Sequence, residues 1–224
     1  MFQATEPPPK HAVGDETRQA LLDAATRVFL EAGFRAARVR DIAVAAGVRL
    51  SAINYHFGGK EGLYLAVLQH HAQLALQHAP LPSPAPGEPL ELRFRAFVRA
   101  LVARMLDPAS PSRIASLMVR EAANPTPALD VMFERFTKPQ SAVLFGMLRE
   151  LFGPAAEPDL IARAGIGVVA QSMVYVGMRA LVDKVRPGFY QRPDGVAELA
   201  EHIATFSWAG LQALARERSE HDAN

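Results

Sequence analysis

Cationic side chains gather in one short stretch of this chain. Residues 33–60 contain five cations and one acid, although the whole sequence has 24 Lys and Arg against 23 Asp and Glu and a formal net charge of only +1. Lys and Arg bind phosphate oxygens, and Arg can also bond guanine through two parallel hydrogen bonds. The stretch therefore indicates a surface for nucleic acid. Its cations are Arg35, Arg38, Arg40, Arg49 and Lys60, and its acid is Asp41.

The same stretch has the pattern of two short helices joined by a tight turn. Gly47 can supply the left-handed backbone that ends the first helix, and Ile53 and Phe57, four residues apart, anchor the second. Such a helix-turn-helix presents its second helix to the major groove of DNA. The residues on or near the outer face, with the flanking cations, are the predicted DNA contacts: Arg38, Arg40, Arg49, Leu50, Ser51, Ala52, Asn54, Tyr55, His56 and Lys60.

Three runs of residues carry a resemblance to a known family. They extend from Arg18 to Phe34, from Val39 to Val48 and from Tyr55 to Leu63. Together they resemble the DNA-binding domain of the TetR family of transcriptional regulators, over about the first third of the chain. A second, weaker resemblance, in residues 54–61 and 120–130, is to the CecR-type branch of that family.

The resemblance assigns roles to single residues. It implies that Tyr55, His56 and Lys60 hold the DNA backbone and that Arg40 can reach a guanine from the helix before the turn. Family members usually place a small capping residue where Arg38 and Arg49 stand. Losing a helix cap typically costs about 1 kcal/mol, so we interpret both changes as a shift toward phosphate contact, with neutral drift as the alternative.

Asn54 also departs from the family pattern, which has Tyr there. Asn54 could read adenine, or more modestly bond a phosphate.

No pattern in the sequence indicates catalysis or a resident cofactor. There is no Gly-rich phosphate loop, no nucleophile elbow and no spacing of metal ligands, so we expect neither an enzyme nor a metal site. His70, His71 and His78 are interpreted as solvated or core residues. The chain has no cysteine, which suits a cytoplasmic protein, and residues 1–14 lack the apolar run of a signal peptide.

Helical periodicity continues almost to the end of the chain, so the predicted fold class is all-α. We expect a disordered arm at 1–14, a helix-turn-helix domain at 15–62 and a helical bundle for ligand binding and dimerisation at 63–224. The first helix should be capped by Asp15 or Thr17 and stopped by Gly33. Residues 80–89 hold five prolines and should form an extended loop.

Later helices are expected at 90–106, 111–123, 127–152, 158–182 and from Asp194 onward. Pro139 should kink the third of these. The fourth is apolar almost all round and should therefore be buried on every side. A membrane span is the weaker alternative there, because polar residues interrupt the run. The last helix should bury the stripe Val196, Leu199, Ile203, Phe206, Gly210 and Leu214.

A few polar side chains among apolar and Met-rich neighbours predict a ligand pocket in the second domain. Residue by residue, simple core packing remains the alternative. The resemblance favours a pocket, since TetR-like regulators commonly hold an effector there. The candidate residues are Met118, Glu121, Phe133, Phe136, Met147, Gln171, Tyr175 and Arg179.

We expect a homodimeric repressor that is released from pseudo-palindromic, double-stranded operator DNA by a small apolar or amphipathic effector. The helices at 158–182 and after 194 would pair with their copies, with Gly165 and Gly167 permitting close approach. An activator or a ligand-independent repressor stays open. The alternative from another class is an all-helical enzyme or small-molecule carrier with a vestigial helix-turn-helix, against which the basic excess argues.

Overall fold

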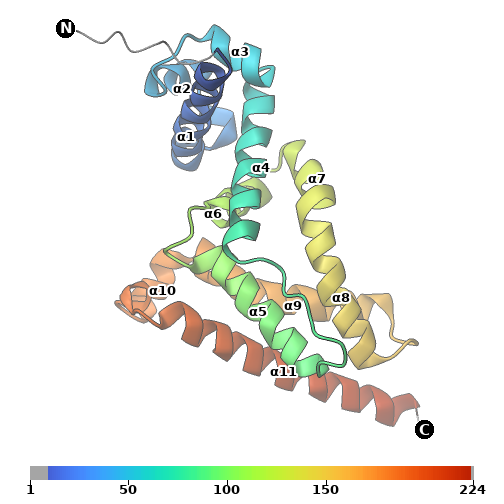
Figure 1. Ribbon diagram of the computed structural model, residues 1–224. Coiled ribbons are helices and arrows are strands. Elements are labelled where there is room, and N and C mark those ends of the chain that lie inside the picture. The colour runs from blue at the N-terminus through green and yellow to red at the C-terminus, as the bar shows by residue number, and fades with distance from the viewer. Residues whose placement is uncertain (1–9, 223–224) are drawn as a thin grey trace, which may run out of the picture. The chain divides into compact units, whose positions relative to one another are not determined.

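The computed structural model describes residues 10–222, and their side chains from 14 to 218. Every element in this part of the chain is helical, which confirms the all-α fold class. The chain divides into two compact units between His70 and His71, inside helix α4 (Lys60–His78). Figure 1 labels this helix. The domain division expected at residues 62 and 63 stays a prediction.

The first unit consists of α1 (Lys10–Ala36), α2 (Val39–Ala45), α3 (Ser51–Phe57) and the first half of α4. Gly33 breaks α1 with φ 75° and ψ 169°, as predicted. The expected cap at Asp15 or Thr17 was wrong, because α1 already begins at Lys10 and residues 10–14 are helical. No Pro stands in that stretch to prevent a helix. The rest of the expected arm, residues 1–9, lies outside the described residues.

Aromatic and aliphatic side chains from α1 and α4 form the core of the first unit. The ring of Phe29 lies 4.8 Å from that of Tyr64, and Leu63 and Val67 are fully buried. Gly62 closes the packing, because a Cβ there would lie 1.9 Å from the carbonyl oxygen of Phe57. The beginning of α4 can therefore lie against the end of α3 only because residue 62 has no side chain.

The second unit contains the remaining helices, and α5 packs along α11 (Figure 1). Its core is a continuous apolar cluster that includes Phe94, Leu148, Ile203 and Trp208. The proline-rich residues 80–89 form a loop, as predicted. The helices of this unit are α5 (Leu90–Leu106), α6 (Ile114–Ala123), α7 (Ala128–Met132), α8 (Lys138–Phe152), α9 (Pro158–Gly177), α10 (Arg179–Val185) and α11 (Gly195–Asp222).

Pro139 disturbs its helix, as predicted, and the structure shows how. A π-helical turn, Phe133–Thr137, stands between α7 and α8, and the backbone N–H of Lys138 bonds the Phe133 carbonyl five residues back. Pro has no N–H and its ring crowds the carbonyl four residues earlier. The wider turn accommodates that ring, while the Gln140 side chain donates to the Phe136 carbonyl at 2.7 Å.

The expectation of one continuous helix at 158–182 was wrong, and burial on every side is not reached within a single chain. The helix ends at Gly177, and Met178, with φ −111° and ψ 28°, separates it from α10. Within one chain α9 leaves a broad apolar face uncovered, with Ile166 65 % and Val174 45 % exposed. Among the described residues, α9 alone is long and apolar enough to span a membrane, a test that core helices also pass.

The stripe predicted for the last helix is correct only over its first half. Leu199 and Ile203 are buried, but Phe206, Gly210 and Leu214 face outward, and Ser207, Trp208 and Leu211 take the inner positions. Trp208 packs against Phe94 with ring centroids 5.4 Å apart. Because α11 has apolar residues on two faces, its neighbour α5 decides which face is buried.

Candidate nucleic-acid interface and ligand cavity

Two buried isoleucines hold the helix-turn-helix. Ile42 on α2 and Ile53 on α3 are both almost fully buried, and Gly47 between the helices has φ 68°. Gly58 ends α3 in the left-handed conformation, with φ 72°. The short helices are therefore fixed from their inner side, which leaves their other faces free for a partner.

The structure places the predicted DNA contacts along these free faces. Seven of the ten are exposed and three are half-buried. Tyr55 is the most open aromatic residue of the group, with 85 % of its surface exposed. The exposed residues are Arg38, Arg40, Arg49, Leu50, Ser51, Asn54 and Tyr55, and the half-buried ones are Ala52, His56 and Lys60.

The arginines of this surface have no anionic partner among residues 10–222, which the structure describes. No ion pair within the described residues engages Arg38, Arg40 or Arg49. Arg38 and Leu50 stand at the N-cap positions of α2 and α3, and neither makes a side-chain capping bond in the part of the chain that the structure describes. Three unpaired guanidinium groups beside two uncapped helix starts form a surface that attracts phosphate.

Lys60 is placed differently from the arginines. Its ammonium donates to the carbonyl of Arg35 at 3.2 Å and lies 4.8 Å from the centre of the Phe34 ring. The side chain therefore fastens the end of α1 to the start of α4. Its expected contact with DNA phosphate stays a prediction.

The second unit contains an apolar cavity of about 290 Å³. Its walls come from the C-terminal half of α4 and from α5, α6, α7, α8 and α9. Most lining residues are apolar, with Gln140, Ser141 and Arg104 among the polar exceptions. Apolar walls with a few polar groups are typical of small-molecule sites. The apolar lining includes Leu76, Phe97, Leu101, Met118, Met132, Phe136, Leu144, Val169 and Met173.

The structure does not bring the eight predicted ligand residues together. Met118 and Phe136 line the cavity, whereas Met147 belongs to the core and Phe133 is 48 % exposed. The other four are engaged elsewhere. Glu121 accepts hydrogen bonds from Thr126, Gln171 donates to Ser207, Tyr175 stacks on Phe189, and Arg179 lies over the ring of Tyr190. Two of the eight predicted residues line this cavity, and the ligand role of the whole set stays a prediction.

Sequence reasoning missed Arg104, a buried residue of α5 that lines the cavity. Arg104 stands three residues after Leu101 on the apolar face of its helix and is only 6 % exposed. A single cation inside an apolar stripe is the signal that could have found it. Burial lowers the pKa of Arg104 to about 10, and no carboxylate among the described residues pairs with it.

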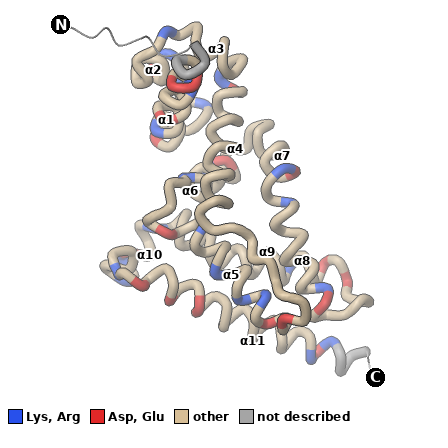
Figure 2. The backbone as a smooth tube through the Cα atoms, in the orientation of Figure 1, with Lys and Arg blue, Asp and Glu red and all other residues tan. Residues whose placement is uncertain are grey.

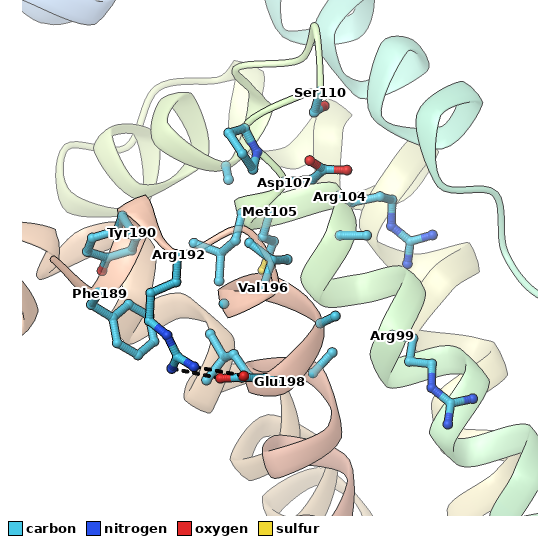
Figure 3. Close-up of a pocket in the computed structure, with 18 of the residues that line it drawn as sticks. Arg99, Arg104, Met105, Asp107, Ser110, Phe189, Tyr190, Arg192, Val196 and Glu198 are labelled. Carbon is cyan, nitrogen blue, oxygen red and sulfur yellow. Dashed lines mark hydrogen bonds and ion pairs between the residues drawn. The ribbon is translucent and has the colours of Figure 1, made fainter.

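A larger cleft of about 1120 Å³ lies between α5, the α5–α6 segment and the residues that precede and begin α11 (Figure 3). It is richer in charge, but its cations are mostly engaged: Arg192 pairs with Glu198, and Arg99 pairs with Glu201. Tyr190 donates to the Tyr175 carbonyl at 2.7 Å, and burial raises the pKa of Tyr190. No cluster of three metal-ligating side chains occurs in the described part of the chain.

Two family models match the chain. The model for bacterial regulatory proteins of the tetR family matches residues 21–67, which include α2 and α3. The model for the C-terminal domain of the HTH-type transcriptional dual regulator CecR matches residues 90–211, more than half of the chain. Neither model describes an enzyme.

Relatives and solved structures agree with these matches. The HTH-type transcriptional activator FasR of Mycolicibacterium smegmatis is 30 % identical over 214 residues, 92 % of this chain and 87 % of FasR. A putative transcriptional regulator from Pseudomonas aeruginosa PAO1 has a TM-score of 0.62 at 26 % identity, covering 91 % of this chain and 94 % of that one.

The structure of the regulator FadR from Bacillus subtilis in complex with stearoyl-CoA is similar at the level of the fold. Its TM-score is 0.61 at 17 % identity, over 84 % of this chain and 96 % of FadR. The helix-turn-helix with its unpaired arginines, the helical second unit and the family matches lead to one conclusion. This chain belongs to the TetR family of bacterial regulatory proteins, as a DNA-binding transcriptional regulator with a CecR-type C-terminal domain.

Proposed function

We propose that this protein is a homodimeric repressor that leaves a pseudo-palindromic operator when an amphipathic ligand occupies the cavity of the second unit. The arginines of the helix-turn-helix carry the proposal, because three exposed guanidinium groups beside α2 and α3, with no ion pair among the described residues, can bind DNA phosphates and base edges. We place this activity in the cytoplasm, where operator DNA lies.

Arg40 is the proposed base-reading residue, and Arg38, Arg49, Tyr55 and His56 are proposed to hold the backbone. Arg40 is exposed on α2 and can form two parallel bonds with guanine. Leu50, Ser51, Ala52 and Asn54, at the start and middle of α3, are proposed to lie in the major groove.

The uncovered faces of α9 and α11 support the dimer. Ile166, Ala170 and Val174 follow one another at four-residue spacing on α9, and all three are exposed. Between Ala164 and Met178 this helix carries no charged residue (Figure 2). On α11, Phe206 is 67 % exposed. A continuous apolar face of this kind is normally covered by a partner, here proposed to be a second copy of the chain.

Of the two glycines expected to permit close approach, only one lies on this face. Gly167 is exposed, and a Cβ there would meet nothing within 4 Å. Gly165 is buried, and a Cβ would lie 2.3 Å from the Phe145 ring of the same chain. Two residues along a helix correspond to about 200° of rotation, so the two glycines serve opposite faces.

The ligand class is proposed from the cavity and from the fold neighbours. The cavity offers apolar walls and one buried cation, which suits a molecule with an apolar chain and a polar end. The FadR structure of the same fold holds stearoyl-CoA, so acyl thioesters of coenzyme A are the first ligands to examine. Repression remains a proposal, since FasR is named an activator and CecR a dual regulator.

Selection of bound fragments from the host genome, with and without acyl-CoA of several chain lengths, tests this function. We expect one or a few pseudo-palindromic sites whose recovery falls when an acyl-CoA is present. Recovery of random fragments at all salt concentrations would contradict a sequence-specific regulator.

Sedimentation tests the dimer separately. Gly167→Glu and Phe206→Glu should yield monomers, because each would bury an unpaired charge in the interface. Gln212→Glu, on an exposed polar position of α11, is the matched control and should leave the dimer intact. Unchanged dimers for both variants would place the interface elsewhere.

A further inference from the structure

Arg104 is a buried cation in the wall of an apolar cavity, and no counter-ion pairs with it within the described residues. Its Nη1 donates to the carbonyl of Ala79 at 2.9 Å, while its Nη2 is buried with no hydrogen-bond partner among the described residues. The nearest carboxylate along the chain, Asp107, is paired with His78 at 2.7 Å. A buried charge that is neither paired nor fully bonded is costly, so proteins rarely retain one without use.

The apolar walls of the cavity leave room beside this cation for the apolar part of a ligand. Phe97, Leu101 and Met105 continue the apolar wall on the same helix as Arg104. Figure 3 shows that Arg104 extends away from Phe189, Tyr190 and Arg192 of the charged cleft. Arg104 also borders that cleft, but the acids of its lining are engaged with other residues: Glu201 with Arg99, Glu198 with Arg192, and Asp107 with His78.

We propose that Arg104 is the anion-recognition residue of the effector cavity, and that the effector is an apolar chain ending in an anionic group. The chain occupies the space between α5, α6, α8 and α9, and the anion accepts from the free Nη2. The anion is either the carboxylate of a free fatty acid or part of a coenzyme A thioester. This inference deepens the proposed function and rests on it for the identification of the cavity as the effector site.

The Arg104 guanidinium also connects the proposed ligand site to helix α4. Arg104 holds Ala79, the residue that follows α4, and Ser112 donates to the carbonyl of His71 at 2.7 Å inside that helix. An anion at Nη2 would bind the same guanidinium whose Nη1 holds the Ala79 carbonyl, and would reposition it. Binding therefore changes how the C-terminal end of α4 is held.

Calorimetric titration into the free full-length protein tests the recognition step. The probes are octanoate, dodecanoate and hexadecanoate, the alcohols of equal chain length, and dodecanoyl-CoA. We expect at least one acid or thioester to bind tenfold or more tightly than its matched alcohol. A dominant response to dodecanoyl-CoA identifies the thioester, and one to the free acids identifies the carboxylate.

Arg104→Met should remove this preference while leaving binding of the alcohol, and Arg104→Lys should retain part of it. Arg99→Met is the matched control on the same helix, because Arg99 lies outside the apolar cavity and should leave the preference unchanged. Thermal unfolding adds an independent measurement. The folded-state pKa of Arg104 lies below its unfolded value, so the cost of burying its charge is present at every pH below about 10. Arg104→Met should therefore unfold at an equal or higher temperature.

Equal affinity for acids, thioester and alcohols, or no binding of any probe, would overturn the proposal. So would an Arg104→Met protein that unfolds at lower temperature and loses alcohol binding as well, because Arg104 would then be a structural residue. Operator binding is measured apart from these titrations. Anion binding that depends on Arg104 but does not release DNA would contradict the proposed function and leave the recognition step standing.

Discussion

In the first unit the candidate DNA contacts all come from residues 38–60, on helices that follow one another directly, whereas the cavity of the second unit draws its walls from residues 72–173. The DNA-facing side chains are mostly exposed, and Arg38, Arg40 and Arg49 form no ion pair within the described part of the chain. The cation in the lining of the cavity, Arg104, is instead buried. A surface site can thus be built from one local motif, while an interior site needs several helices to meet.

The largest effect that we expect is a loss of folding stability when the close packing of α4 against the end of α3 is disturbed. Gly62→Ala would place a Cβ 1.9 Å from the backbone carbonyl of Phe57, which cannot rotate away. We expect a loss of roughly 3 kcal/mol or more in stability, at the upper end of overpacking costs. Chemical denaturation followed by circular dichroism measures it. Gly146→Ala, in open space on α8, should be neutral or stabilising, and equal effects for both would show that Gly62 is not a close contact.

The coupling free energy between ligand binding in the cavity and DNA binding should be nearly as large as the stability loss of Gly62→Ala. A ligand that weakens DNA binding a hundredfold supplies about 2.8 kcal/mol of differential affinity, within the usual range. Because coupling is reciprocal, operator DNA must weaken that ligand by the same factor. Titration of dodecanoyl-CoA into free and DNA-bound protein checks this expectation. Equal affinities would mean that the ligand is not an effector.

Removal of one base-reading side chain should have a smaller effect, confined to one position of the operator. Arg40→Ala should cost roughly 1–3 kcal/mol and relax the preference for guanine at that base. Binding to a library of operator variants measures it. A uniform loss across the library would make Arg40 a phosphate contact, and Asn54→Ala in the same library shows whether Asn54 reads adenine.

Lys60→Ala should have the smallest effect on DNA binding. The variant tests whether a cation that already contacts the protein, unlike the exposed arginines, also binds phosphate. If Lys60 contacts phosphate, the variant loses affinity for all sequences alike and the salt slope falls by about 1. The contacts with Arg35 and Phe34 offer another role, in holding the fold. A lower unfolding temperature with an unchanged salt slope would assign Lys60 to the fold alone.

Much of the first unit was predictable because its signals are local. Gly33, Gly47 and the buried Ile53 each mark a turn or an inner face within a few residues of the site that they position. The cation count of residues 33–60 pointed to nucleic acid, since charge distribution needs no tertiary contact to be recognised. The early start of α1 was missed because capping preferences are worth only about 1 kcal/mol and are easily overridden.

The sequence alone also determined that the second unit is helical, that Pro139 disturbs its helix and that residues 80–89 form a loop. These features depend on backbone chemistry within a few residues. Only the tertiary structure decided which faces meet: it buried Gly165 under Phe145, turned Phe206 outward and brought Arg104 to the wall of the cavity. Helices with apolar residues on more than one side can bury any of those sides, so the choice follows from the packing of neighbours that lie far apart in the chain.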